Sequence, residues 1–161
     1  MHRPGKLRLL SLALIALLPS FLKRPCYRLF FGYRIGRRVR VGFSIIDAES
    51  CQIGDDSQIG HLNVIIAVRS LTLGDHVRIG HLNIIRGGSE VNLGRYSELL
   101  RLNEINSIRD PEVVNPVDPR FSLGPGSIIT TGHLYECFTL RIGYRIICLA
   151  HGGGSWYVIG K

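Results

Sequence analysis

Three short segments of the chain repeat the same polar residues at a fixed spacing. HLNVI (61–65), HLNII (81–85) and RLNEI (101–105) overlay when the sequence is shifted by twenty residues, so one asparagine recurs in each segment. Stacked asparagines usually form a structural ladder, because their amides hydrogen-bond to one another along the stack. Beside that structural interpretation, the candidates for substrate binding in these segments are Asn83, Asn103 and Arg101.

Two histidines in the same segments raise the question of a metal site. His61 and His81 occupy equivalent positions, and zinc is commonly held by about four ligands that include histidine. Arg101 takes the third equivalent position, and no other close histidine completes a tetrahedral set. We therefore predict no metal site.

One histidine is the candidate general base. Asn103 lies ten residues after Leu93, and the same count from Leu123 reaches His133 in the segment ITTGHLYECF. Imidazole suits general base catalysis because its unperturbed pKa lies near working pH. The alternative is that His133 is one further ladder or core histidine. Glu136 could orient the ring as part of an acceptor site, or it could be a solvated loop residue.

Pairs of aliphatic residues six positions apart return along most of the chain. The spacing from one pair to the next is 18, 20, 20, 30 and 19 residues, which is near or above three times six. Six residues per side and three sides per coil predict a triangular solenoid, with a glycine after the aliphatic residue to relieve crowding and to permit turn geometry. Neighbouring coils should pair as parallel strands. The pairs are Ile35/Val41, Ile53/Ile59, Leu73/Ile79, Leu93/Leu99, Leu123/Ile129 and Ile142/Cys148.

The longest spacing points to an insertion. Its excess contains SIRDPEVVNPVDPRFS, whose three prolines cannot lie in a central strand, so residues 107–121 are predicted to loop out beside His133. Binding residues concentrate in loops held on rigid scaffolds, so this loop is interpreted as a wall of an acceptor site, with Asp118 as a substrate-binding candidate. An insertion without a function is the alternative.

Runs of the form [IVL]-G-x-x-x-x, such as IGDDSQIG, LGDHVRIG and RIGRRVRVG, resemble the hexapeptide-repeat acyltransferases. The order YRIGRRVRVG, IGHLNVI and ITTGHLYECFTLRIG is similar to bacterial sugar O-acetyltransferases of polysaccharide biosynthesis, and related acetyltransferases carry their general base in a similar T-x-G-H turn. The resemblance implies an all-β fold, a left-handed parallel β-helix. We expect it over residues 35–161, after a helical N-terminal arm of residues 1–34 that contains a short helix.

The same resemblance implies a chemistry. It predicts a homotrimer in which His133 takes the proton of a hydroxyl on a carbohydrate acceptor, and the alkoxide attacks acetyl-CoA held between subunits. The residues expected at the donor are Gly152, Gly153 and Trp156, in the segment YRIICLAHGGGSWYVIGK. The alternative is a non-catalytic or truncated β-helix that serves as a scaffold or assembly protein, because members of this arrangement usually continue for at least another coil.

The positive charge is confined to the N-terminal arm. Ten of the twenty Lys and Arg lie in the first 40 residues, and no acidic residue precedes Asp47. The unbroken apolar run of residues 12–18 is shorter than the roughly 20 residues that span a bilayer. We predict peripheral contact of residues 3–28 with an anionic membrane, with a secretory signal and a helix packed on the domain as alternatives.

Two further expectations concern partners and location. No recognition motif accompanies the basic arm, so a nucleic-acid partner is not predicted. The four cysteines form no CxxC pair and no dense framework, which favours reduced thiols. We therefore expect a cytoplasmic protein, at the inner face of the cell membrane where the arm meets it.

Overall fold

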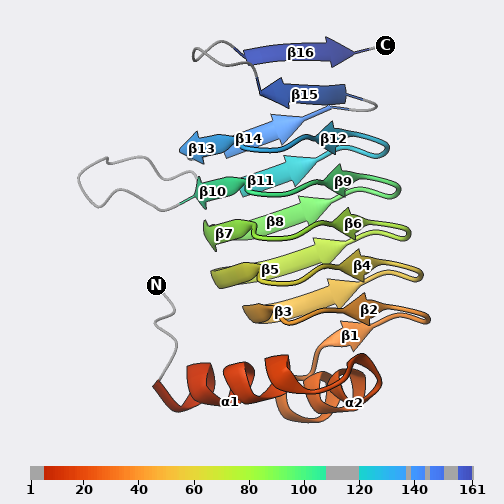
Figure 1. The fold of residues 1–161 in the computed structure, drawn as a ribbon, viewed down its shortest axis with the longest axis vertical. Helices are drawn as coiled ribbons and strands as arrows, with labels where there is room; N and C mark the ends of the chain where they lie inside the picture. The colour runs from red at the N-terminus through yellow and green to blue at the C-terminus, as the bar shows by residue number, and fades with distance from the viewer. Residues whose placement is uncertain (1–5, 108–119, 137–138, 144–145, 151–155, 161) are drawn as a thin grey trace.

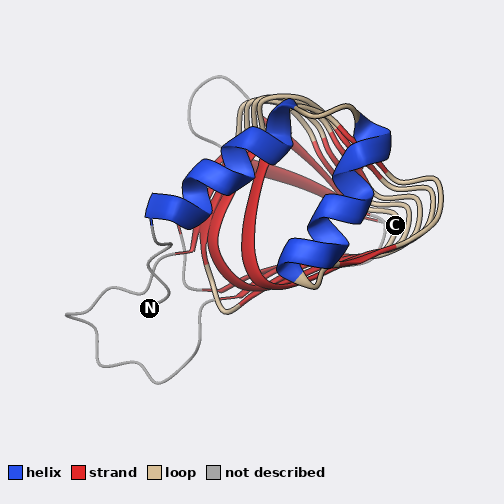
Figure 2. Ribbon diagram, turned by 90° about the horizontal axis from the view of Figure 1, so that it is seen from below, coloured by secondary structure: helices blue, strands red, loops and turns tan. Residues whose placement is uncertain are grey.

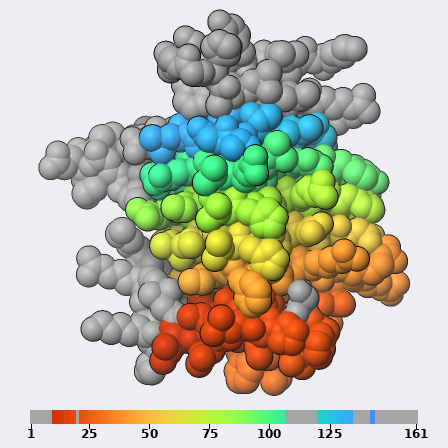
Figure 3. Space-filling view, viewed as in Figure 1, coloured from red at the N-terminus to blue at the C-terminus, as the bar shows by residue number. Residues whose placement is uncertain are grey.

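The computed structural model describes residues 6–107, 120–136, 139–143, 146–150 and 156–160, which form a parallel β-helix with two helices at its N-terminal end (Figure 1). The coils stack along one axis, as successive bands of the space-filling view (Figure 3). The predicted fold class, an all-β parallel β-helix preceded by helix, is confirmed. The left-handed sense that the resemblance implies stays a prediction.

The helices are α1 (Lys6–Leu17) and α2 (Ser20–Phe31). The strands are β1 (Arg34–Ile35), β2 (Arg40–Val41), β3 (Ile45–Ile53), β4 (Gln58–Ile59), β5 (Val64–Leu73), β6 (Arg78–Ile79), β7 (Ile84–Gly87), β8 (Glu90–Leu93), β9 (Glu98–Leu99), β10 (Glu104–Ser107), β11 (Arg120–Leu123), β12 (Ile128–Ile129), β13 (Leu134–Glu136), β14 (Thr139–Ile142), β15 (Ile146–Ala150) and β16 (Trp156–Gly160). Two helices stand where a single short helix was predicted. Pro19 separates them, because its extended backbone at ψ 151° ends one helical segment and starts the next.

The strands line the faces of a triangular prism (Figure 2). One face carries β2, β4, β6, β9, β12 and β15. A second carries β7, β10 and β13 against the first residues of β5, and a third carries β8, β11 and β14 against its last residues. The long strands β3 and β5 therefore bend from one face to the next.

The predicted register is confirmed at every pair. One ladder joins Ile35, Ile53, Leu73, Leu93, Leu123 and Ile142, and the other joins Val41, Ile59, Ile79, Leu99, Ile129 and Cys148. The first five residues of each ladder are buried. These two ladders form the centre of the core.

Glycines follow the aliphatic residues because the next coil lies too close for a side chain. A Cβ on Gly42 would meet the carbonyl group of Gly60, and a Cβ on Gly60 would meet that of Gly80. The left-handed backbone of the turns falls elsewhere, for example at Asp56 and His76, each with φ 57°. The predicted relief of crowding is thus confirmed, whereas the second predicted reason for these glycines, turn geometry, is wrong at these positions.

Two segments depart from a regular solenoid. The insertion lies between β10, which ends at Ser107, and β11, which begins at Arg120, close to its predicted bounds; residues 108–119 lie outside the described residues. At the other departure, β16 runs antiparallel to β15. The predicted domain of residues 35–161 assumed parallel coils throughout. The last described strand departs from that expectation, because it is antiparallel to its neighbour.

The two helices lie across the N-terminal end of the solenoid (Figure 2). Leu12, Ile15 and Tyr27 are buried in the same cluster as the first coil, and the Tyr27 ring stacks on Tyr33 with centroids 5.6 Å apart. The arm is thus packed on the domain, which was one of the sequence alternatives, while contact with a membrane stays a prediction. In the described part of the chain, neither helix has the length and apolarity needed to cross a membrane.

Lys23 of α2 replaces hydrogen-bond donors that a preceding coil would supply. Its Nζ donates to the carbonyl oxygens of Val41, at 3.2 Å, and Gly42. One coil further on, the equivalent carbonyl groups of Ile59 and Gly60 accept from a backbone N–H and a serine hydroxyl of the coil before. The Lys23 side chain is buried, and desolvation lowers its pKa. The amine therefore satisfies two acceptors that the end of the stack would leave open.

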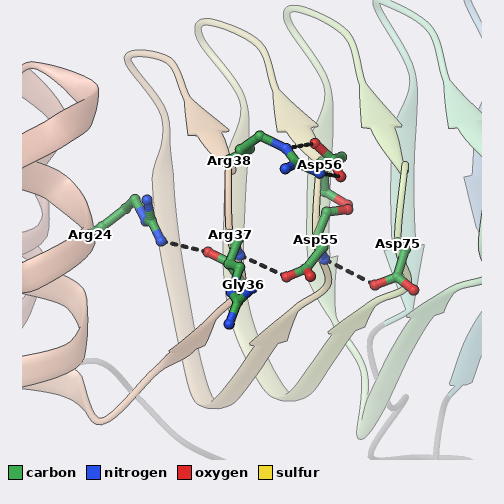
Figure 4. A network of polar contacts seen from close by, with 8 residues as sticks. Arg24, Gly36, Arg37, Arg38, Asp55, Asp56 and Asp75 are labelled. Atoms are coloured by element: carbon green, nitrogen blue, oxygen red, sulfur yellow. Dashed lines mark hydrogen bonds and ion pairs between the residues drawn. The ribbon is translucent and has the colours of Figure 1, made fainter.

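Two arginines of α2 act in the same way. Arg24 Nη2 donates to the carbonyl oxygen of Gly36 at 2.8 Å (Figure 4), and Arg28 donates to that of Ile35. Inside the solenoid, the equivalent carbonyl of Ile53 accepts from the Gly36 N–H of the preceding coil. Helix α2 thus closes the open edge of the first coil with cationic donors.

A column of carboxylates continues outside this edge (Figure 4). Asp55 Oδ1 accepts the Arg37 N–H at 2.7 Å, and Asp75 Oδ1 accepts the Asp55 N–H at 2.9 Å. Beside it, the Arg38 guanidinium hydrogen-bonds to Asp56 and holds the pKa of that carboxyl below its usual value. Like the backbone hydrogen bonds of the sheets, these exposed side-chain contacts join each coil to the neighbouring one.

Replacing the buried amine tests the role of α2 as a cap. We expect Lys23→Met to lower the free energy of unfolding by about 2 kcal/mol, because two buried carbonyl groups lose their donor. Urea unfolding at neutral pH measures it. The control Arg38→Gln removes only an exposed ion pair and should change the free energy of unfolding little. A Lys23→Met protein as stable as the parent would contradict the capping role.

Candidate functional site

A buried column of polar residues runs up one corner of the solenoid, through Ser44, Asn63, Asn83, Asn103 and His133. In each step, a backbone N–H donates to the side-chain oxygen of the coil before. The distances are 3.1 Å from Asn63 N to Ser44 Oγ, and 3.0 Å from Asn83 N to Asn63 Oδ1, from Asn103 N to Asn83 Oδ1 and from His133 N to Asn103 Oδ1. The predicted alignment of His133 with the asparagine ladder is confirmed.

The asparagine amides use their hydrogen bonds within this column. Asn83 Nδ2 donates to Asn63 Oδ1 at 3.0 Å and to the Leu100 carbonyl at 2.8 Å, and its Oδ1 accepts from Asn103 Nδ2 at 3.0 Å. Full pairing in a buried setting favours the structural role that the sequence also allowed. Substrate binding by Asn83 and Asn103 stays a prediction, and neither side chain is exposed.

The ring of His133 contacts a hydroxyl group that sequence reasoning missed. Its Nε2 lies 3.0 Å from Oγ1 of Thr130. Thr130 stands at the position that Gly60, Gly80 and Leu100 hold in earlier coils, so the glycine is already replaced in the coil before. What is particular to this coil is an imidazole in the column and a hydroxyl group in contact with it. The sequence signal was the first threonine of the segment TTGH.

An outer column of rings lies at the same corner. The rings of His61 and His81 are parallel to within 7°, with centroids 5.5 Å apart, and Phe43 lies 5.2 Å from His61. Nδ1 of each imidazole accepts a backbone N–H of the preceding coil, at 3.1 Å for His61 and 2.9 Å for His81. A neutral ring that accepts at Nδ1 carries its proton on Nε2, which leaves no lone pair there for a metal ion.

No metal cluster stands out in the described part of the chain, where no three His, Cys, Asp or Glu side chains gather closely enough to hold an ion. The thiol of Cys51 is buried, and burial raises its pKa to about 12. At neutral pH this group stays a protonated thiol, which is a poor nucleophile. The prediction that the site uses no metal rests on the sequence and stays a prediction.

Arg101 is the predicted substrate-binding residue that the structure brings to the surface near His133. Its side chain is exposed, and its carbonyl oxygen accepts the N–H of Gly132 at 3.2 Å. Gly132 directly precedes His133 in the chain. The outer corner beside the candidate base therefore carries a positive charge.

The remaining predicted site residues are only partly placed. Glu136 ends β13, where its backbone pairs with Asn106, and Trp156 begins β16, where its backbone pairs with Ala150; their side chains are not described. Asp118, Gly152 and Gly153 lie outside the described residues. Their roles at the acceptor and the donor stay predictions.

A separate open hollow lies at the other end of the solenoid. It has a volume of about 490 Å³ and is bounded by Arg28, Tyr33, Gln52, Asp55 and Asp75, among others. These residues belong to α2 and to the coils nearest it, whereas His133 lies several coils further on. The hollow is therefore not part of the candidate site.

The fold and the ladder define the class of the protein as a parallel β-helix with a buried polar column. No family model matches the chain, and no curated protein or solved structure matches it either. Membership of the hexapeptide-repeat acyltransferases therefore stays a prediction from the resemblance.

The column should contribute strongly to stability. We expect Asn83→Ala to lower the free energy of unfolding by about 3 kcal/mol, because the carbonyl of Leu100 and two donors of Asn103 lose their partner on residue 83. The control Asn92→Ala removes a half-buried amide outside the column and should cost under about 1 kcal/mol. Urea unfolding of both variants measures the difference, and equal losses would contradict a special role for the column.

Proposed function

We propose that the chain is an acyltransferase that moves an acetyl group from acetyl-CoA to a hydroxyl of a sugar or polysaccharide precursor, with His133 as general base. The observation that carries this proposal is the contact between Thr130 and His133, at 3.0 Å, in the coil where an imidazole takes the place of the asparagines of the column. The β-helix and its hexapeptide repeats support it through the family resemblance. Donor binding between the subunits of a homotrimer belongs to the same proposal.

Stacking does not require an imidazole at position 133. An asparagine would also continue the column, because its amide can both accept from and donate to the next coil, as Asn83 does. The imidazole differs from those amides in that its Nε2 contacts a hydroxyl group of its own coil. A side chain that breaks a local structural rule is a candidate for chemistry.

The proposed reaction passes a proton through Thr130. Its Oγ1 donates a proton to Nε2 of neutral His133 and takes the proton of the acceptor hydroxyl. The resulting alkoxide attacks the thioester carbonyl, the C–S bond breaks, and the imidazolium returns its proton to the CoA thiolate. Thr130 is half-buried whereas His133 is buried, so the hydroxyl stands on the side that an acceptor can approach.

A non-catalytic scaffold is the second candidate. The observation that favours it is the burial of His133, which is 1% exposed and whose backbone N–H continues the structural column. In that case the imidazole is one further member of the ladder, and the function lies in the stacked surface of the solenoid.

The replacement His133→Asn separates the two candidates, because it removes the imidazole and leaves an amide where the column uses one. For an acyltransferase, we expect CoA release that depends on an acceptor hydroxyl to fall by at least about 100-fold. The free energy of unfolding should stay equal or rise. Thiol detection with acetyl-CoA and a panel of sugars measures the first quantity, and urea unfolding the second.

The matched control is His81→Asn, which changes an exposed imidazole of the outer column and should leave CoA release unchanged. Equal release from His133→Asn and the parent would exclude His133 as the base. Absence of both release and acetyl-CoA binding in the parent would favour the scaffold.

The hydroxyl of Thr130 can be tested separately. Thr130→Val keeps the volume but removes the proton path, so kcat should fall by about 10-fold to 100-fold with KM for acetyl-CoA unchanged. Thr130→Ser restores the hydroxyl and should recover most of kcat. A Thr130→Val protein with the parent's kcat would remove Thr130 from the mechanism.

A further inference from the structure

The outer faces of α1 and α2 expose an unusual number of large apolar side chains. Their exposed fractions are 60% for Leu10, 60% for Leu14, 70% for Leu17, 73% for Phe21, 42% for Leu22, 81% for Leu29 and 70% for Phe30. We call these seven side chains the apolar cap face. Contiguous apolar surface of this kind marks an interaction site more often than isolated exposed residues do.

The apolar cap face looks away from the solenoid. On α1, the buried residues Leu12 and Ile15 point to the core, while Leu10, Leu14 and Leu17 recur at three- and four-residue spacing on the opposite side. On α2, the cationic donors and Tyr27 face the first coil. Because both helices lie across the same end of the solenoid (Figure 2), their outer sides form one surface at that end.

The charge around this surface is mostly positive. Residues 1–46 contain ten Lys and Arg and no Asp or Glu. In the coil next to the helices, Arg34, Arg37 and Arg40 are exposed, and this coil contacts α2 through β1 and β2. Acidic side chains also lie near the helices, since β3 contacts α1 and carries the exposed Glu49, and Asp55 lines the hollow beside α2. The rim of the apolar cap face is therefore predominantly, not exclusively, cationic.

We propose that the apolar cap face docks on an anionic lipid bilayer, with the axis of the solenoid standing along the membrane normal. Leucine and phenylalanine side chains would enter the boundary between headgroups and acyl chains, and the arginines of the rim would lie at the headgroups. The charge complementarity argues for this partner, since each cation near an anionic leaflet strengthens binding about fivefold. The membrane contact does not depend on the acyltransferase activity.

A second copy of the chain fits this surface less well. A symmetric contact would place the helices of two copies, which lie in a segment without acidic residues, directly against one another. Like charges that face each other across an interface oppose association. The bilayer presents the opposite charge and an apolar layer together.

The test is flotation of the purified full-length chain with two kinds of vesicle, one of phosphatidylcholine and the other of phosphatidylcholine and phosphatidylglycerol in equal parts. We expect binding to the anionic vesicles that weakens with added salt, and at least about tenfold weaker binding to the neutral ones. The variant Leu14→Ser, Phe21→Ser, Leu29→Ser should lose at least about tenfold in partition to anionic vesicles.

A matched control is the pair Leu62→Ser and Leu102→Ser, which removes leucines that are 61% and 55% exposed on the solenoid, away from the helices; binding should not change. Circular dichroism and urea unfolding establish that each variant is folded. A second variant, Arg34→Gln, Arg37→Gln, Arg40→Gln, should weaken binding to anionic vesicles by about fivefold per charge.

Three results would overturn the proposal. The first is absence of binding of the parent chain to anionic vesicles, and the second is equal binding of the parent and the apolar triple variant. The third is a dimer in light scattering that the triple variant dissociates while vesicle binding is absent, which would assign the apolar cap face to a contact between copies of the chain.

Discussion

Hydrogen bonding between successive coils is the constraint on which the rest of this structure depends. The N–H of Gly42 donates to Ile59 O, that of Gly60 to Ile79 O and that of Gly80 to Leu99 O, at 2.7 to 2.8 Å. Coils paired in this way lie about 4.8 Å apart, so any residue meets its equivalent at close range. The same spacing accounts for the aliphatic ladders that fill the core and for the glycines that leave room for the next backbone. It also accounts for the asparagines that hydrogen-bond to equivalent asparagines of neighbouring coils.

A stack of this kind has unpaired backbone hydrogen-bonding groups at both ends. The chain caps the two ends in different ways. At the N-terminal end, Lys23, Arg24 and Arg28 donate to carbonyl groups that would otherwise accept from an earlier coil. Long cationic side chains can do this because they reach over the helix surface and carry several donors. At the other end, β16 turns back along β15 in antiparallel pairing, which interrupts the repeat. One consequence follows for α2: its polar contacts face inward, so its apolar residues are left on the outside.

The parts of the structure that repeat could be predicted from the sequence, because stacking requires the same residue types at equivalent positions of each coil. The six aliphatic pairs, the alignment of His133 with Asn103 and the position of the insertion after Ser107 all follow from that period. A contact that occurs only once has no counterpart in other coils, so it produces no periodic pattern in the sequence. Lys23 was counted with the membrane-facing basic residues, yet it is buried against the first coil. The contact of Thr130 with His133 was missed for the same reason, since Gly60, Gly80 and Leu100 at the equivalent positions have no hydroxyl group.

The length of the solenoid between its two ends relates the proposed membrane contact to the proposed chemistry. Four coil steps separate Ile35, next to α2, from Leu123, which begins the coil of His133. At about 4.8 Å per step, with a helix diameter of about 10 Å beneath, the imidazole would stand roughly 30 Å above a bilayer that holds the apolar cap face. A hydroxyl on a lipid headgroup cannot reach that height, whereas one on an extended glycan attached to a lipid can. The rigid stack would thus set a distance between membrane and chemistry, and this distance favours an oligosaccharide or polysaccharide acceptor over a simple glycolipid.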